Sequence, residues 1–450
     1  MLRQLVQFSV EAQRLMRGLG LPEMARFDEW WPGLPAGLGQ DKHAAGRLRR
    51  HAPFAQVSPA GSAATLGRFP LPGAAMRLLH RASPWRSLFA DSEFPDPSRL
   101  PPLLAPLRDA LTELGPAPTL SDAHAWQPRL VAALMRLDLP AWRISQLISD
   151  HNDWLYHRAI QLAQSEMEGQ GWGPPPVAFC VLIMGSGARQ ESLLAPDQDN
   201  GMIIADYPDS RHTEIDGYFQ SLGERFTDRL DRAGIPLCSG HVMARWPMWR
   251  KRISEWGEQL AIWTAERRTK RVQQANILLD FRPVYGEVAL AEALADRVAR
   301  LLPKAGLFLD EMGVLLDELP VALDRFGRLS GSLEGVPHEH AINLKRQGLL
   351  PLVAAARLLS LRHGVRVIDT RERLAALVVK EVLPEARCRA LTAALERLQG
   401  LLLEEQCRVL GTGHGADSWV DVSRLGEDQR MLLRLDLQQI RRFRRRAKRG

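Results

Sequence analysis

Runs of apolar residues at two different spacings divide the chain into candidate strands and candidate helices. Residues 177–184 are apolar throughout, which is the length and composition of a buried strand. A glycine-containing turn and a polar connection follow, and a second apolar run occupies residues 202–205. We therefore expect a strand, a turn, a short helix or loop, and a second strand, in this order.

Apolar residues at helical spacing fill most of the chain outside these strands. The pattern covers residues 123–170, 212–234, 253–276 and most of the chain from 288 onward, apart from a polar joint at 327–340. Residues 276–286 instead alternate as a strand that ends in a turn at Gly286. The pattern predicts an α+β domain followed by an all-α domain.

The first part of the chain has a different character. Proline, glycine and alanine are dense between about residues 31 and 118, and strand-like runs are absent there. Such a segment is either a loosely packed accessory region with short helices or partly disordered. We therefore expect three parts: an accessory segment of unassigned function at 1–120, the α+β domain at 121–300 and the helical domain at 301–450.

Composition narrows the class of protein. The 450 residues carry a net charge of +7, which permits acidic partners such as nucleotides without demanding nucleic acid. The 4 cysteines show no paired spacing, so we expect free thiols in a reducing, cytoplasmic compartment. No apolar run is long enough to cross a membrane. The basic C-terminal run RRFRRRAKRG could touch nucleic acid or anionic lipid, but a solvated helix end is the preferred interpretation.

The connection between the first two strands carries candidate chemistry. Glycines at Gly185 and Gly187 leave backbone N–H groups, with the Ser186 hydroxyl, open to an anion. Asp197 and Asp199 precede the second strand two positions apart, so their carboxylates point to the same side. Such a pair suits Mg²⁺, which is often held by one or two carboxylates plus substrate phosphates.

Each piece alone is often only a turn or a helix cap, but together, between two strands, they favour a nucleotidyl-transfer site. A P-loop is excluded because no Gly-Lys-Ser/Thr follows the turn, and a dinucleotide fingerprint because a third glycine is missing.

These residues resemble the signature of the polymerase-β-type nucleotidyltransferase superfamily, whose fold is a small mixed sheet with helices. The string GSGARQESLLAPDQDNGMII is similar to a narrower bacterial group, related to the catalytic domain of the P(II)-protein uridylyltransferase. Its specific marks are the Arg-x-Glu after the turn and the Asp-Gln-Asp-Asn block. The resemblance implies an all-helical, substrate-binding C-terminal domain.

The resemblance also implies an activity. A nucleoside monophosphate would pass from a nucleoside triphosphate to an acceptor hydroxyl, which could belong to a protein. Asp197 and Asp199 would be catalytic and would hold Mg²⁺, while Gly185, Ser186 and Arg189 would grip the phosphates.

Asp280 is the candidate for a third acid. It is a carboxylate in an otherwise apolar predicted strand, where a buried charge is costly unless it is paired or bound to metal. Related enzymes carry a third carboxylate followed by arginine and then glycine, and Asp280, Arg282 and Gly286 match that pattern. The resemblance thus implies a catalytic, metal-binding Asp280. The alternative is a structural ion pair with Arg282.

Three further matches have structural alternatives. Arg250, in a Trp-Arg pair, would contact phosphate, or it would be a solvated arginine at a helix start. Lys345, like Asn343 and Arg357, would approach the nucleotide from the helical domain, or it would be ordinary surface charge. Residues 151–153 resemble a polar cluster of the family, and capping after a helix break is the preferred interpretation.

Two other functions remain open. A catalytically silent nucleotide sensor would not need three acids, so the sequence argues against it. An RNA-directed nucleotidyltransferase is supported by the basic C-terminal run alone. Neither the base nor the acceptor follows from the sequence.

Overall fold

The computed structural model describes residues 105–115, 119–137, 139–265, 276–331, 335–413 and 415–449. All of them belong to one compact unit. The predictions for nearly all of the accessory segment, and for the end of the helix expected at 253–276, lie outside the described residues.

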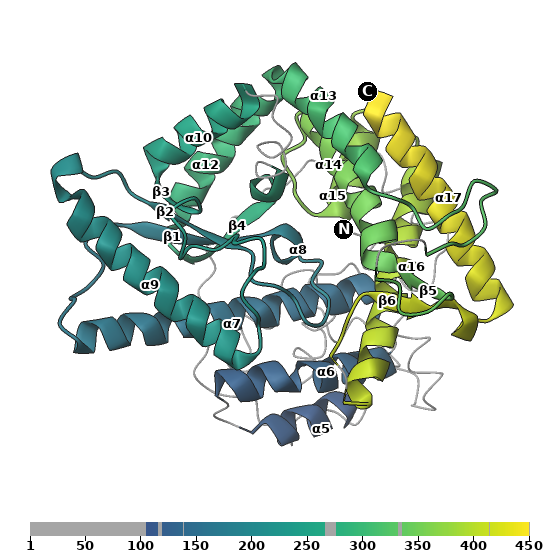
Figure 1. Ribbon diagram of the computed structural model, residues 1–450, viewed down its shortest axis with the longest axis horizontal. Coiled ribbons are helices and arrows are strands. Elements are labelled where there is room, and N and C mark those ends of the chain that lie inside the picture. Colours follow the sequence, from purple (N-terminus) through teal and green to yellow (C-terminus); the bar gives the residue numbers. More distant parts are fainter. Residues whose placement is uncertain are drawn as a thin grey trace, which may run out of the picture. The chain divides into compact units, whose positions relative to one another are not determined.

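A four-stranded sheet lies at the centre of the first domain (Figure 1). Its strands are β1 (Phe179–Met184), β2 (Asn200–Ile204), β3 (Arg250–Arg252) and β4 (Phe281–Gly286). The order is β3-β2-β1-β4, with β1 antiparallel to both neighbours and β2 parallel to β3. The sheet is therefore mixed, and the ends of β1 and the starts of β2 and β4 meet at one edge.

Strand β1 is buried on both faces, which explains its uninterrupted apolar sequence. Phe179, Val181 and Ile183 pack into a core with α7 (Ala141–Gly169) and α9 (His212–Ala233). The alternate residues of β1 belong to a second core, which includes residues of α10 (Ile253–Ala265) and α12 (Val288–Leu301). Two apolar layers thus hold the sheet in place.

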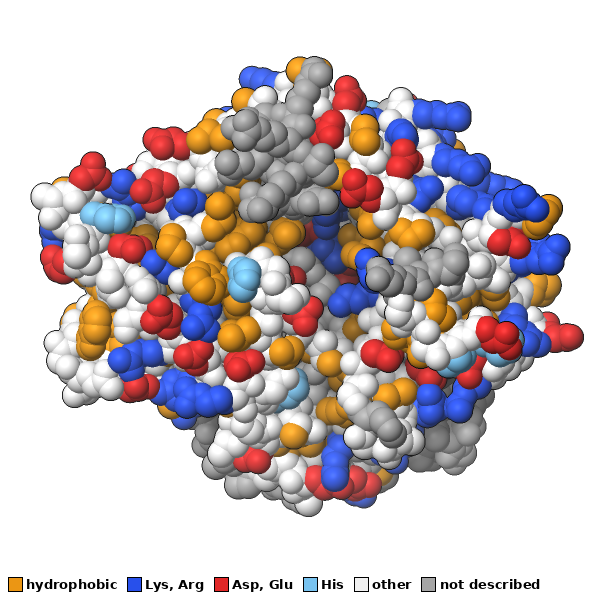
Figure 2. Space-filling model, viewed as in Figure 1, with side chains coloured by type: hydrophobic (Ala, Val, Ile, Leu, Met, Phe, Trp, Pro, Cys, Tyr) orange, Lys and Arg blue, Asp and Glu red, His pale blue; other side chains and the backbone are white. Residues whose placement is uncertain are grey.

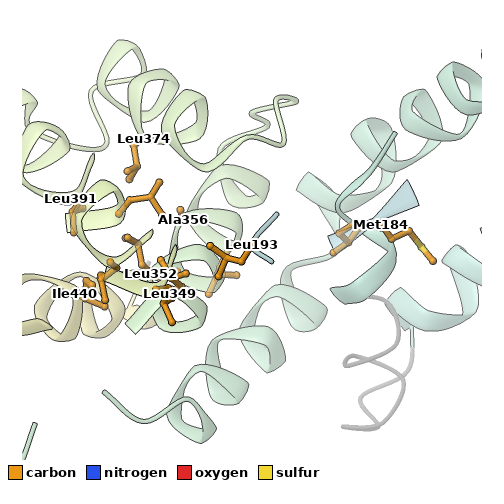
Figure 3. Packing of buried hydrophobic residues seen from close by; sticks show 14 of the residues in the cluster. Met184, Leu193, Leu349, Leu352, Ala356, Leu374, Leu391 and Ile440 are labelled. Carbon is orange, nitrogen blue, oxygen red and sulfur yellow. The ribbon is translucent and has the colours of Figure 1, made fainter. Parts of the chain in front are cut away.

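The second core continues into the C-terminal helical domain. Figure 3 shows Leu193, from the connection between β1 and β2, beside Leu349 and Leu352. The helices of this domain are α13 (Gly306–Leu315), α14 (Leu350–Arg362), α15 (Thr370–Val379), α16 (Glu385–Gly411) and α17 (Glu427–Arg449). A π-helical turn, η8 (Lys345–Leu349), leads into α14. The predicted class, an α+β domain followed by a helical domain, is confirmed.

Shorter elements complete the fold. Helices α5 (Ala105–Leu114) and α6 (Leu120–Arg136) precede α7, and a short helix, α8 (Gly185–Ala188), follows β1 as expected. A two-stranded antiparallel sheet joins β5 (Ala341–Asn343) to β6 (Trp419–Asp421). The 3-10 turns are η5 (Asp209–Arg211), η6 (Leu302–Lys304), η7 (Leu316–Glu318) and η9 (Val422–Arg424).

Two predicted boundaries are wrong. The strand expected at 276–286 begins only at Phe281, since residues 276–278 are helical and Asp280 lies in a bend before the strand. Helix α7 also continues through residues 151–153, where a break was expected. These polar residues remain inside a helix because they have buried partners: Gln127 donates to Asn152 Oδ1 at 2.7 Å, and Arg282 binds Asp153.

The basic C-terminal run forms the end of α17, where blue side chains gather in Figure 2. Several of its arginines bind backbone oxygens in the connections between other elements: Arg441 donates to Asp324 O at 3.1 Å and Arg446 to Val382 O at 2.7 Å. Part of the basic run thus serves packing. Within the described part of the chain, no helix is long and apolar enough to span a membrane.

Candidate active site

A cavity of about 100 Å³ lies between the β1–β2 connection and the helical domain. It gathers five of the residues predicted for the site: Ser186, Arg189, Asp197, Asp199 and Lys345. A smaller pocket of about 20 Å³ shares Ser186 and the two aspartates with it and is also lined by residues of α7. These five predicted residues therefore line one continuous region, although they come from three separate segments.

Gly185 holds the turn in a conformation that favours glycine. Its φ is +62°, and a Cβ at this position would lie 3.0 Å from Asp199 Oδ2. The backbone ties the turn to both flanking strands, because Met184 N donates to Asp199 O at 2.9 Å and Gly185 N donates to Asp280 O at 3.0 Å. The turn is therefore packed directly against the Asp199 carboxylate.

The electrostatic surroundings of Asp199 favour a cation. Burial, together with the neighbouring charge of Asp197, raises the pKa of the Asp199 carboxyl to about 6, against the lowering effects of Cys238, Lys345 and Arg189. The thiol of Cys238 lowers the pKa of the Asp199 carboxyl, so Cys238 lies near the acidic pair. Cys238 was not identified from the sequence, which indicated only that it is one of four free thiols.

The connection after the turn is fastened to the helical domain. Arg189 Nε donates to Glu191 Oε2 at 2.7 Å, and Glu191 Oε1 accepts from the backbone N–H of Thr370 at 2.9 Å. Further along, Leu194 N donates to Gln406 Oε1 at 3.1 Å. The Arg-x-Glu pair singled out in the sequence thus joins the two domains, which explains its position without a direct catalytic role for Glu191.

Asp280 lies at the same edge of the sheet but is surrounded by arginines. Its fully buried carboxylate binds Arg189 at 2.7 Å, Arg357 at 2.6 Å and Arg373 at 2.7 Å. Burial opposes the charge, but Arg357, Arg373 and Arg189 outweigh it and hold the pKa of the Asp280 carboxyl below its usual range. The carboxylate is therefore ionised and already bound.

The structure does not bring Asp280 into a metal-binding group with Asp197 and Asp199. Among the described residues, no three His, Cys, Asp or Glu side chains form a cluster that could hold a metal ion. The alternative, an ion pair between Asp280 and Arg282, is wrong, since the guanidinium of Arg282 binds both carboxylate oxygens of Asp153, at 2.6 and 2.8 Å. The ion-pair partners of Asp280 and of Arg282 could not be predicted from the sequence, because they are far away along the chain.

Arg250 lies elsewhere and is fully engaged. It is buried in β3, where Nε and Nη2 donate to the carboxylate of Asp216 at 3.0 and 3.1 Å. Its Nη1 donates to the carbonyl oxygens of Ala244 and Arg245. These bonds give Arg250 a structural role, and Arg250 does not line the cavity that holds the other predicted residues.

The helical domain supplies one predicted cation to the cavity. Lys345, the first residue of η8, lines it, and its charge acts on Asp199. Asn343 instead accepts a hydrogen bond from Arg346 N at 2.9 Å, and Arg357 binds Asp280. Of this trio, only Lys345 lies where it could meet a nucleotide.

A much larger cavity, of about 1280 Å³, lies along β4. It is lined by parts of α7, α12 and α15 and by the segment before α15. Arg189 lines both this cavity and the smaller one that holds the acids. A second ligand along β4 would therefore lie close to the predicted phosphate site.

The sequence matches two protein-family models, whose descriptions agree with a nucleotidyltransferase domain followed by a helical domain. The family model described as "Putative nucleotidyltransferase DUF294" matches residues 125–270. The model described as "Putative nucleotidyltransferase substrate binding domain" matches residues 306–450. No curated protein matches the chain. The two matched ranges contain the acidic turn region and the helical domain respectively, and the chain belongs to the nucleotidyltransferase family that these models describe.

Proposed function

We propose that this protein transfers a nucleoside monophosphate from a nucleoside triphosphate to a hydroxyl group. One observation carries the proposal: Ser186, Arg189 and Lys345 line the same cavity as Asp197 and Asp199. A hydroxyl and two cations suit phosphate oxygens, and paired carboxylates suit a divalent cation. The lining of this cavity therefore supports the proposal of a nucleotidyl-transfer site.

The reaction forms one bond and breaks one. The acceptor oxygen bonds to the α-phosphorus, and the bond from that phosphorus to the oxygen that bridges to the β-phosphate breaks. Pyrophosphate leaves with the bridging oxygen, and the hydroxyl proton passes to solvent. Arg189, held by Glu191 and Asp280, and Lys345 would stabilise the negative charge that grows on the leaving group.

The acidic pair fits Mg²⁺. The carboxyl group of Asp199 is buried beside that of Asp197, and a divalent cation would relieve their repulsion. Asp197 and Asp199 would hold the ion with phosphate oxygens completing its coordination. When bound, Mg²⁺ would supply positive charge to the phosphates during transfer.

For the acceptor we propose a hydroxyl side chain of another protein, and for the donor UTP, following the resemblance to the P(II)-protein uridylyltransferase. The cavity along β4 supports a large acceptor, because about 1280 Å³ exceeds what one small metabolite needs. Asp280 is not assigned as the base that takes the hydroxyl proton, since three arginines bind its carboxylate and lower its pKa, which makes it a weak base.

The test is transfer of labelled nucleotide. Purified protein and a cell lysate are incubated with each labelled nucleoside triphosphate and Mg²⁺, and mass spectrometry locates any added nucleotide. Asp197→Asn and Asp199→Asn should abolish the product. Asp206→Asn is the matched control, because Asp206 is an exposed carboxylate just after β2 that bonds Ser254.

A defined protein that carries uridylate would support the full proposal. Label found on nucleic acid would instead identify RNA as the acceptor. Near-normal transfer by either Asp→Asn variant would overturn the assignment of the acidic pair.

A further inference from the structure

The helical domain contributes a buried glutamine, Gln399, to the lining of the cavity of about 100 Å³ that also holds Asp197 and Asp199. The walls contributed by α14 and α16 are apolar except for two glutamines: Leu350, Val353 and Leu395 line the cavity with Gln399 and Gln406. Leu395, Gln399 and Gln406 are four and seven positions apart, so they share one face of α16. The cavity therefore has an apolar side as well as a phosphate-binding side.

The two glutamines differ in their hydrogen bonds. Gln406 is satisfied, because its Oε1 accepts from Leu194 N and its Nε2 donates to Leu194 O and Asp417 O. Gln399 is only 1% exposed, and its Oε1 has no hydrogen-bond partner among the described residues. A buried amide oxygen normally has a partner, because leaving it unpaired costs free energy. Gln399 thus has unused hydrogen-bonding capacity, and it is one of the residues that line the cavity.

We propose that Gln399 recognises the nucleobase of the nucleoside triphosphate. This inference rests on the proposed function, since it assumes that the triphosphate binds beside Ser186 and Lys345. A base has apolar faces and a polar edge, which matches a wall lined by leucine and valine that also includes a glutamine with an unpartnered amide oxygen. Oε1 of Gln399 accepts an N–H group from that edge, and Nε2 can donate to an adjacent acceptor.

A site built to hydrogen bond one edge discriminates against bases whose groups do not match it, because the buried amide is then left unpaired. Gln399 is therefore assigned as a specificity-determining residue. Loss of Gln399 should change the relative affinities for the four nucleoside triphosphates more than it changes the affinity for the triphosphate group that they share.

The test compares Gln399→Met with Gln347→Met. Methionine keeps the length of the side chain and removes the amide, so the fold should persist. Gln347 is the matched control, because it is also 1% exposed with an unpartnered Oε1, yet it does not line this cavity. Dissociation constants for ATP, GTP, CTP and UTP with Mg²⁺ are measured by calorimetry for both variants and the wild type.

We expect Gln399→Met to weaken binding of the preferred triphosphate about tenfold, which is the effect of one lost hydrogen bond. Binding of the other three triphosphates should weaken about twofold or less. Gln347→Met should leave the order and the ratios unchanged. Equal weakening of all four triphosphates, or an unchanged preference, would overturn the inference. If the wild-type protein binds all four triphosphates equally, the inference about Gln399 is wrong and the proposed function is unaffected. If the wild-type protein binds none of them, the proposed function is wrong as well.

Discussion

Arg357 of α14 grips Asp280, the residue before β4, through two nitrogen atoms: Nε at 3.0 Å and Nη2 at 2.6 Å from Oδ2. The same oxygen accepts from Arg189 Nη1 at 2.7 Å. Asp280 therefore connects the helical domain to the arginine of the predicted phosphate site. Its carboxylate acts as a joint between two domains.

This arrangement predicts that Asp280 is first of all a structural residue. Asp280→Asn should lower the free energy of unfolding by about 3–5 kcal/mol, because it leaves three buried guanidinium groups facing a neutral side chain. Urea denaturation measures the change. Asp209→Asn is the control, since Asp209 pairs with Arg252 at the surface and its loss should cost about 1 kcal/mol or less.

A stable Asp280→Asn variant that binds nucleotide normally but transfers none would contradict this prediction. It would restore Asp280 as the third catalytic acid.

Gly185 offers a test of the packing between the turn and the acidic pair. Gly185 and Gly364 share a φ of +62°, but a Cβ would meet Asp199 only at Gly185, since nothing lies within 4 Å of that position at Gly364. Both alanine variants should lose about 1–2 kcal/mol of stability from the left-handed conformation.

Only Gly185→Ala should also lose most nucleotide transfer, because its methyl group displaces the Asp199 carboxylate. Thermal unfolding and transfer assays measure the two effects. Equal activity of the two variants would show that the turn tolerates a side chain.

Asp369 should make stability depend on pH. Burial and the nearby charge of Glu191 raise the pKa of its carboxyl from 3.8 to about 6, although it caps α15 by accepting from Glu372 N at 2.8 Å. The folded protein therefore binds this proton more tightly than the unfolded chain does. The resulting stabilisation is fully present below about pH 4 and is lost as the pH rises through 6.

Asp369→Asn keeps an acceptor for the cap and carries no charge. Its unfolding free energy should exceed that of the wild type by about 1–2 kcal/mol at pH 8, with the difference shrinking towards pH 4. Denaturation at both pH values measures it. A pH-independent difference would mean that Asp369 has the same pKa in both states.

Arg250 is predicted to stabilise the fold without touching nucleotide. Arg250→Ala removes a buried guanidinium that binds Asp216 and two carbonyl oxygens, so stability should fall by about 3 kcal/mol or more. The dissociation constant for nucleoside triphosphate, measured by calorimetry on the folded variant, should stay within about twofold of the wild type, since Arg250 does not line the cavity. Weakening of about tenfold or more, the effect of a lost hydrogen bond to a charged group, would return Arg250 to the phosphate site.

The sequence alone determined the local parts of this protein. An unbroken apolar run predicted β1, because a strand covered on both faces has no polar side to alternate with. Gly185 and the Asp197–Asp199 pair were identifiable because a tight turn and two carboxylates on one side depend only on neighbouring residues. The order of an α+β domain and a helical domain followed from the change in hydrophobic spacing.

Only the tertiary structure decided which charges meet. Asp280 and Arg282 are two residues apart, yet their guanidinium and carboxylate partners lie 77 to 129 positions away along the chain. A buried ion pair requires two segments to be packed face to face, and residue spacing carries no record of that packing. For the same reason the sequence offered both Lys345 and Arg250 as nucleotide-binding candidates and could not distinguish them. In the structure, Arg250 is buried and pairs with Asp216.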